Sequence, residues 1–454
     1  MDDTDQSKTP ETRFFRFLRI YPEERGVFAV FGLVFFCNAL ATQIASVAAV
    51  SGFMKGDGVG QIPIVWMIDM VFILMTAGLQ SFIIDRFDRS KLVKTMIIGF
   101  AVIFLLLRVS FHLNEPGWLN YGLMLIISDQ QWLFFPLVFW TLAQDIFSVA
   151  QAKRLFSPIA SMGFIGQLTG LLLVSVAPQL LNSIGVAAEE LLIFNVAIYF
   201  SAYLLVTFGL RKFKTQANVI QQIKTPMDTF FAGWDFIKEI PVFRYLAICI
   251  LAVNLSLTFV EFGFLTITQR VFSTNYHTFY ALYRFGLVLI SFILQGLATS
   301  RIIQKLSLKN AFMVMPLALV AGSIWMLFTG IFSAIGGMVI PKVAQFTADD
   351  SARRSFQALV PEERRGRVST FLESTLFGFG VIIASLLILG ALFLGNWIGQ
   401  AHASYIYRGL AVATGLWAVW AAFKMHQVYD YSMLNWRLKR RERSVTVPDK
   451  PNFH

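Results

Sequence analysis

Polar and ionisable residues recur at helical spacing inside stretches of this sequence that are otherwise apolar. One such stripe lies in "PKVAQFTADDSARRSF" (341–356), and its members are Lys342, Gln345, Asp349 and Arg353. Their spacing of i, i+3, i+7 and i+11 places them on one face of an α-helix. A charged group in hydrocarbon costs at least about 2.5–3.5 kcal/mol, so such a face is expected to meet water or a partner. The stripe therefore predicts a water-lined helix, bent at Pro341.

Further intramembrane polar residues extend the candidate site. Asn254, Thr258 and Glu261 share a helix face, and Tyr280, Arg284, Ser291 and Gln295 share another. We assign substrate binding to Arg284, Lys342, Glu261, Asn38, Tyr280 and Gln345, and proton coupling or charge balance to Asp69 and Asp129. An internal Arg284–Glu261 ion pair is the alternative for those two residues. Arg108 and Arg408 lie near predicted external ends, where snorkelling to the interface is as good an account as function.

A charged loop and a charged helix end are the candidate gates. The loop "SFIIDRFDRSK" (81–91) partly fits the pattern G-x-x-x-D-R-x-G-R-R/K of major facilitator proteins, at Asp85, Arg86 and Arg89. Asp349 and Arg353 form an i, i+4 pair with the acid first, which is the favourable order. We expect these ion pairs to close one transport state and to open in the other. Plain enrichment of bases in cytoplasmic loops is the alternative explanation for the loop.

The elements that must position these residues are membrane-spanning helices. The 454-residue chain is 56% hydrophobic and 14% charged, against about 25% charged residues in soluble domains. Runs of about 20 apolar residues span a bilayer as helices. Twelve are predicted, at 26–50, 62–84, 92–112, 117–143, 156–178, 189–210, 245–267, 278–299, 310–333, 334–356, 368–394 and 404–427. The predicted fold class is an all-α membrane protein with two six-helix halves, of major facilitator type.

The distribution of basic residues predicts the orientation. With both termini in the cytoplasm, 32 of the 38 Lys and Arg residues fall on the inside and only Lys55 and Arg270 outside. The predicted parts are a cytoplasmic N-terminus with an interfacial basic and aromatic segment (1–25), a six-helix bundle (26–210), a cytoplasmic linker (211–244), a second six-helix bundle (245–427) and a basic tail (428–454). We expect location in a bacterial inner membrane.

Several other kinds of chemistry lack their parts in this sequence. There is no G-x-x-x-x-G-K-[ST] segment for an ATPase and no H-E-x-x-H for a metalloprotease. Both cysteines lie in predicted spans, so no disulfide framework or metal cluster is indicated. The net charge of +11 is explained by topology and by contact with anionic lipid. We therefore expect no enzyme, no cofactor, no metal and no nucleic-acid partner, and a monomer in the membrane.

The segment "FWTLAQDIFSVAQAKRLFSPIASMGFIGQLTG" (139–170) resembles the ATP/ADP translocase family of nucleotide transporters. The resemblance extends to "YPEERGVF" (21–28), "QIPIVWMIDMVF" (61–72) and "FQALVPEERRGRVSTFLE" (356–373). It implies exchange of ATP for ADP, or proton-driven nucleotide uptake, by alternating access. At the turn after the fourth helix it adds Asp145, Lys153 and Arg154 as gating residues. Gln144 stands where the family usually has Asn, and Gln151 where it usually has Glu, so the turn carries less charge than usual.

The spacing arguments alone predict only a transporter with a basic, polar cavity. Bases facing such a cavity offset the charge of nucleotide phosphates, and Trp132, Phe139 and Tyr280 are candidates for a wall against adenine. Proton-coupled transport of another organic anion or solute on the same fold is the alternative. A non-transporting membrane scaffold is a third hypothesis, in which Arg284 and Lys342 would be dispensable.

Overall fold

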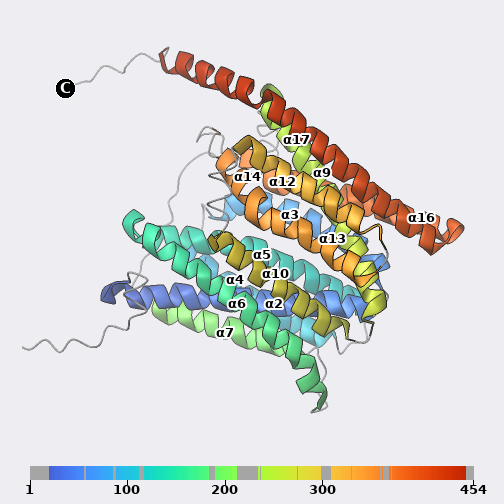
Figure 1. Cartoon of the computed structure of the whole chain (residues 1–454). Helices are drawn as coiled ribbons and strands as arrows, with labels where there is room; N and C mark the ends of the chain where they lie inside the picture. The colour runs from blue at the N-terminus through green and yellow to red at the C-terminus, as the bar shows by residue number, and fades with distance from the viewer. Residues whose placement is uncertain are drawn as a thin grey trace, which may run out of the picture. The chain divides into compact units, whose positions relative to one another are not determined.

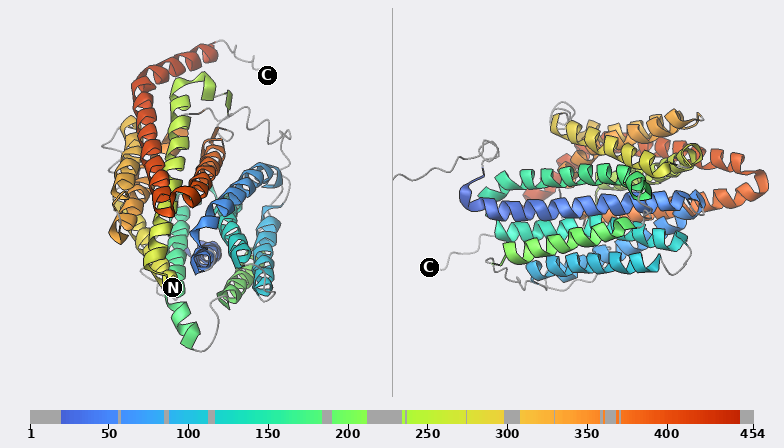
Figure 2. Two further views of the ribbon diagram at one scale, coloured as in Figure 1. Left: turned by 90° about the vertical axis from the view of Figure 1, so that its right-hand side faces the viewer. Right: turned by 90° about the horizontal axis from the view of Figure 1, so that it is seen from below.

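A computed structural model describes most of the chain as helices (Figures 1 and 2). The described residues are 20–55, 58–84, 88–111, 117–183, 190–211, 234–235, 237–273, 275–297, 308–328, 330–357, 360, 368–369 and 371–445. Within them, eleven helices are long and apolar enough to cross a membrane, and a shorter apolar helix covers Asn310–Trp325. The predicted all-α class is confirmed, and each of the twelve predicted spans contains an apolar helix. The chain is an integral membrane protein.

The helices group into two compact units, which are described separately. Unit 1 contains η1 (Pro22–Glu24), α2 (Arg25–Lys55), α4 (Arg89–Ser110), α5 (Gly117–Ile146), α6 (Val149–Ser183), α7 (Leu191–Gly209) and the first part of α10 (Tyr276–Leu297). Unit 2 contains η2 (Val59–Gln61), most of α3 (Ile62–Ile84), α9 (Pro241–Val271), α12 (Leu308–Trp325), α13 (Ile331–Ala344), the π-helical turn η4 (Gln345–Asp349), α14 (Asp350–Gln357), the π-helical turn η5 (Phe371–Thr375), α16 (Leu376–Ile398) and α17 (Gln400–Val445).

In unit 1, α2 is the central helix, and it packs against α5, α6 and α7 (Figures 1 and 2). The contact between α2 and α6 depends on glycines of α6, which have no side chain. A Cβ on Gly166 would lie 2.5 Å from the Phe36 carbonyl oxygen, and one on Gly170 would lie 2.8 Å from the Leu40 carbonyl oxygen. Small residues four apart allow such a close approach of two helix backbones, which is how helices associate within lipid.

In unit 2, α9 takes the corresponding central place, side by side with α17 (Figures 1 and 2) and packed against α16. Of the 31 residues of α9, most are buried, including Phe243, Phe259 and Phe262. The α12–α13 contact again uses glycine, since a Cβ on Gly322 would lie 2.5 Å from the Gly337 carbonyl oxygen. An apolar helix buried on nearly all sides is typical of the centre of a membrane bundle.

The ends of the ninth and the last helix differ from the sequence prediction. The ninth helix was predicted to run to 333 but ends at Trp325, because Gly330 adopts a φ of 144°, which breaks the helix before α13. The last helix was predicted to end at 427, yet α17 continues to Val445 through the predicted tail. The division into halves at 210 and 245 stays a prediction, and the compact units group most of α3 with unit 2 and the first part of α10 with unit 1.

Candidate functional site

A run of polar side chains is buried on α2 within unit 1. Asn38, Thr42, Gln43 and Ser46 are all less than a tenth exposed. Thr42 satisfies its hydroxyl locally, because Oγ1 donates to the Asn38 carbonyl oxygen at 2.8 Å. The other three side chains remain available for contacts with neighbouring helices.

Arg284 of α10 meets this part of α2. Its Nη2 donates to Gln43 Oε1 at 2.9 Å and its Nη1 donates to Ser46 Oγ at 3.2 Å. The guanidinium carbon also lies 5.9 Å from the ring centroid of Tyr280, one helical turn earlier on α10. Gln43 and Ser46 are three residues apart on one helix, so together they hold a planar guanidinium in one orientation. The predicted site residues Arg284 and Tyr280 thus lie together, with two residues of α2 beside them.

Asn38, the third predicted site residue of unit 1, is engaged elsewhere. Tyr199 of α7 donates its hydroxyl to Asn38 Oδ1 at 2.9 Å, and Gln131 of α5 in turn donates to the Tyr199 hydroxyl. The network joins α2, α5 and α7 and buries all three side chains. Buried polar networks of this kind fix the relative rotation of helices, so Asn38 positions α2 in this structure and its predicted contact with substrate stays a prediction.

Sequence reasoning did not select Gln43, Tyr199 or Gln131. Gln43 lies outside the i, i+4 series that starts at Asn38, and that series guided the selection. A polar residue in each of three apolar helices was nevertheless a signal, since a buried amide or phenol in lipid must find a partner. The sequence contained the partners but not the pairing.

Of the proposed aromatic walls for adenine, Phe139 is unavailable. It is 1% exposed, and it stacks on Phe35 at 4.9 Å and packs against Phe31 at 5.3 Å, measured between ring centroids. Its type and place made it a candidate, but packing uses both of its faces. Tyr280 is buried as well and stacks on Tyr276 at 5.8 Å, while Trp132 is 63% exposed.

Unit 1 carries two charged clusters near its predicted cytoplasmic end. Arg89 at the start of α4 forms an ion pair with Asp145 at the end of α5. Arg154 of α6 lies 2.8 Å from Glu24 and its guanidinium carbon lies 4.6 Å from the Tyr21 ring centroid. Three of the predicted gating residues are therefore paired here, and Glu24 is a partner that the sequence analysis did not single out.

The other predicted gating residues of this region are not described by the structure. Asp85 and Arg86 lie outside the described residues, and nothing is described of the Lys153 side chain. Gln151, where an acid was expected, donates Nε2 to Glu24 Oε1 at 3.0 Å. The glutamine therefore supports the Glu24–Arg154 pair, whereas an acid at that position would repel Glu24.

In unit 2, the predicted polar stripe is interrupted by a change of helix type. Lys342 and Gln345 are half-buried, and Asp349, only 4% exposed, forms the predicted ion pair with Arg353. Between Gln345 and Asp349 the chain forms a π-helical turn that follows Pro341. A π turn takes more residues than an α turn, so it rotates the later part of the stripe relative to the earlier part. The straight stripe expected from α-helical spacing is therefore wrong.

The candidate coupling acids differ in burial. Asp69 of α3 is 0% exposed, whereas Asp129 of α5 is half-buried, as is Glu261 of α9. An acid buried in an apolar helix is a candidate for proton uptake or for pairing with a base. The burial of Asp69 is therefore compatible with both predicted roles, proton coupling and charge balance.

The two arginines with alternative assignments, Arg108 and Arg408, both contact neighbouring side chains. Arg108 Nε donates to Glu190 Oε2 at 3.0 Å, beside the start of α7. Arg408 is 5% exposed, and its guanidinium carbon lies 5.7 Å from the Tyr405 ring centroid. Arg408 is therefore buried within the protein, whereas Arg108 is half-buried in an ion pair with Glu190, and snorkelling stays a hypothesis for Arg108.

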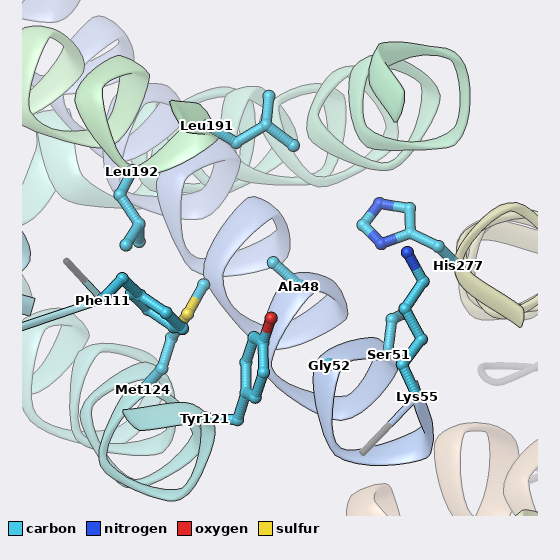
Figure 3. A pocket seen from close by; sticks show the side chains of 10 residues that line it. All are labelled: Ala48, Ser51, Gly52, Lys55, Phe111, Tyr121, Met124, Leu191, Leu192 and His277. Carbon is cyan, nitrogen blue, oxygen red and sulfur yellow. The ribbon is translucent and has the colours of Figure 1, made fainter. Parts of the chain in front are cut away.

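A small cavity lies in unit 1 among α2, α5, α7 and α10 (Figure 3). Its volume is about 30 Å³, and Ser51, Lys55, Tyr121 and His277 are its polar lining. Figure 3 shows the Lys55 amino group beside the His277 ring, whose Nε2 lies 2.9 Å from the Val174 carbonyl oxygen. This volume accommodates a water or two but no nucleotide. Among the described residues, no cluster of His, Cys, Asp and Glu could hold a metal ion.

The chain resembles known proteins in its fold, and no match was found in sequence. No protein-family model matches it, and no curated protein sequence matches it. Among solved structures it is similar to the nucleoside transporter NupG, with TM-score 0.64 and 13% identity over 88% of this chain and 98% of that one. It is also similar to the POT family transporter PepTSo, with TM-score 0.63 and 11% identity over 91% and 99%.

A bacterial homologue of the iron transporter ferroportin is a third similar structure, with TM-score 0.61 and 12% identity over 88% of this chain and 99% of that one. At such identities the likeness concerns the fold alone. It bears out the major facilitator-type fold that the sequence predicted, and it does not distinguish the ATP/ADP translocase family within that fold. The chain has the major facilitator-type fold.

Proposed function

We propose that the chain is a secondary transporter that moves a small organic anion by alternating access. The observation that carries the proposal is the position of Arg284, a guanidinium within a membrane-spanning helix, hydrogen-bonded to Gln43 and Ser46. A cation is costly in hydrocarbon, and intramembrane bases commonly mark a solute pathway. The names of similar structures include a nucleoside transporter, a peptide transporter and a homologue of an iron transporter, which supports transport without selecting a substrate.

A nucleotide or a similar organic phosphate is the substrate we favour. The resemblance to ATP/ADP translocases supports this choice, and it lies in the segments 21–28, 61–72, 139–170 and 356–373. Guanidinium groups bind phosphate through two parallel hydrogen bonds. We assign Lys342, Gln345 and Glu261 to the same function within unit 2.

Alternating access requires contacts that hold one state and release in the other. The ion pairs Arg89–Asp145 in unit 1 and Asp349–Arg353 in unit 2 are the contacts we assign to this task. Each lies near a helix end, and the Arg89–Asp145 side chains are the more exposed of the two pairs, so breaking that pair costs less than breaking Asp349–Arg353. The π turn before Asp349 supplies a place where a helix can change register.

Uptake by reconstituted protein tests the proposal. Liposomes loaded with ADP should take up labelled ATP, and Arg284→Gln should lower uptake about ten- to a hundredfold, because a hydrogen bond to a charged group is worth about 1.5–3 kcal/mol. Arg284→Lys should retain part of the uptake. Arg211→Gln, which removes an exposed arginine at the end of α7, is the matched control and should transport normally. Folded protein with no uptake of any nucleotide or organic phosphate would refute this substrate class.

The complete burial of Asp69 favours one further candidate, proton-coupled uptake of an organic anion. In this mechanism a proton gradient drives accumulation into liposomes that contain no counter-substrate. Asp69→Asn, or Asp129→Asn, should then abolish the gradient dependence while leaving exchange between two pools of substrate intact. If accumulation needs a loaded counter-substrate and ignores the gradient, exchange is the mechanism.

A further inference from the structure

The first turn of α10 is attached to the C-terminal part of α6 by two hydrogen bonds to main-chain oxygens. His277 Nε2 lies 2.9 Å from the Val174 carbonyl oxygen, and Thr278 Oγ1 donates to the Ser175 carbonyl oxygen at 3.3 Å. Because a carbonyl oxygen only accepts, the imidazole donates through Nε2. His277 is 7% exposed and Val174 is 0% exposed, so the shorter of the two bonds is shielded from water.

Pro178 makes the Val174 carbonyl oxygen available. In an α-helix this oxygen accepts a hydrogen bond from the N–H four residues later, which for Val174 belongs to residue 178. Pro178 lies inside α6, and proline has no N–H to donate. A buried carbonyl oxygen that receives no hydrogen bond costs free energy. His277 therefore satisfies an acceptor that α6 leaves without its usual donor.

The two bonded segments come from different predicted halves of the sequence. α6 precedes the predicted linker (211–244) and α10 follows it. The residues Thr274–Leu289 nevertheless group with α2 and α6 in unit 1, whereas α10 from Ile290 onward groups with unit 2. The start of α10 is thus bound to helices of the first predicted half. In a transporter that works by alternating access, contacts between halves at one side must open when access changes sides.

Both segments lie at the predicted external side, where α6 ends and α10 begins. The end of α2 lies there too, and its Ser51 lines the small cavity of unit 1 together with His277 (Figure 3). Ser51 is 1% exposed. Position 51 is therefore shielded beside the His277 contact in this structure, which makes it a suitable reporter of opening.

We propose that the His277–Val174 hydrogen bond is an external latch, which holds the start of α10 against α6 in this structure and opens when the external side becomes accessible. Thr278 adds a second, longer bond. The inference rests on the proposed transport function, because the latch regulates access to the same pathway. Pro178 suits the latch to repeated opening, since water can replace the imidazole at the Val174 carbonyl oxygen without any bond within α6 being broken.

Reaction of a Ser51→Cys variant with a water-soluble thiol reagent tests the latch without any substrate. The full-length protein is purified in detergent, and its free cysteines Cys37 and Cys249 are replaced by alanine so that only the reporter reacts. We expect His277→Leu to raise the labelling rate about fivefold, the factor that corresponds to one hydrogen bond of about 1 kcal/mol. His277→Gln keeps an N–H donor near the place of Nε2 and should change the rate by less than about twofold.

Proline variants decide whether the Val174 carbonyl oxygen carries the effect. Pro178→Ala restores the N–H of residue 178, so the carbonyl oxygen regains a donor within α6. In that background His277→Leu should raise the labelling rate by less than about twofold, against about fivefold with the proline in place. Pro158→Ala, which changes the other proline inside α6, is the matched control and should leave the effect of His277→Leu unchanged.

A cross-link tests whether the latch opens during transport. A bifunctional methanethiosulfonate that joins Thr278→Cys to Ser175→Cys should stop nucleotide uptake into liposomes until a reductant cleaves it. The control is a disulfide between Gly32→Cys of α2 and Met162→Cys of α6, because a Cβ on Gly32 would lie 3.9 Å from the Met162 Cβ, within the range for a disulfide. That bridge joins two helices of the first predicted half and should leave uptake intact.

Four results would each overturn the latch. They are an unchanged labelling rate in His277→Leu, an equal rise in His277→Gln, an equal effect of His277→Leu with and without Pro178, and full uptake by the cross-linked Thr278 and Ser175 variant. The unfolding midpoint of each variant identifies a folding defect, and if His277→Leu does not fold, the cross-link decides. Folded protein that takes up no nucleotide refutes the proposed substrate instead, and the labelling rates then decide whether the latch exists.

Discussion

The central helices of the two units share a short pattern but use it differently. α2 carries "NALAT" (38–42) and α9 carries "NLSLT" (254–258), and in each the threonine donates to the carbonyl oxygen of the asparagine at 2.8 Å. Asn38 accepts a hydrogen bond from Tyr199 of α7. Asn254 instead donates Nδ2 to the Ile250 carbonyl oxygen of its own helix at 2.9 Å.

The surroundings explain the difference. A Cβ on Gly380 of α16 would lie 2.8 Å from the Asn254 Cβ, so the asparagine of α9 lies at a helix crossing with no room for a partner side chain. In α2 the glycines of α6 instead approach Phe36 and Leu40, which leaves the Asn38 amide free to reach α7. The same local pattern therefore stabilises a crossing in one unit and a polar network in the other.

The largest loss of stability should come from placing a large side chain at the glycines where two helices cross. Gly166→Leu in unit 1 and Gly322→Leu in unit 2 place a side chain against a backbone carbonyl oxygen 2.5 Å from the new Cβ. We expect each to lower stability by about 3 kcal/mol or more, the upper range for overpacking. Thermal unfolding in detergent measures it. Gly99→Leu is the control, since a Cβ there meets nothing within 4 Å, and an equal loss in that variant would contradict the explanation.

The next largest difference in stability is expected between substitutions of Asn38 in unit 1 and Asn254 in unit 2. Asn38→Ala leaves the Tyr199 hydroxyl without its acceptor, so we expect a loss of about 1–2 kcal/mol, near the top of measured hydrogen-bond effects in membrane bundles. Asn254→Ala removes only a bond to its own helix and keeps the Cβ against Gly380, so about 0.5 kcal/mol is expected. Tyr199→Phe should reproduce the larger effect. Equal losses of stability for Asn38→Ala and Asn254→Ala would contradict the different roles assigned to the two asparagines.

The ion pairs offer a smaller contrast. In Asp349–Arg353 the side chains are 6% and 15% exposed, and in Glu24–Arg154 they are 10% and 24% exposed. Each pair is tested by a double-mutant cycle in which Asp is replaced by Asn, Glu by Gln and Arg by Leu. We expect a coupling free energy of about 1 kcal/mol for Asp349–Arg353 and about half that for Glu24–Arg154, which water screens more. Raising the salt concentration should reduce the second coupling more. The reverse order would show that burial does not set their strength.

The threonines should behave alike. Thr42→Val and Thr258→Val each remove a hydroxyl that bonds the carbonyl four residues earlier in its own helix. Such back-bonding contributes little to helix stability, so we expect a change of about 0.5 kcal/mol or less in both, measured by the unfolding midpoint. A clear loss in only one of them would reveal an unrecognised partner for that hydroxyl.

The membrane-spanning helices and part of the candidate site could be predicted from local sequence. Apolar runs of bilayer length predicted the helices, and α3 begins and ends where the run at 62–84 does. The i, i+4 spacing predicted the Asp349–Arg353 ion pair, since both partners lie on one helix. Arg284 was selected because a guanidinium in an apolar run is conspicuous without any knowledge of its neighbours.

Contacts between helices were not readable in the same way. Nothing local links Arg284 to Gln43 or Tyr199 to Asn38, because the pairing depends on which faces two helices turn to each other. The positive φ of Gly330 and the π turn after Pro341 are likewise backbone conformations that the apolar pattern does not predict. Hydrophobicity along one helix is a property of the chain itself, and it determined the spans. The partner of each polar group was decided only by tertiary structure, because close approach at a few glycines fixes how every neighbouring helix is rotated.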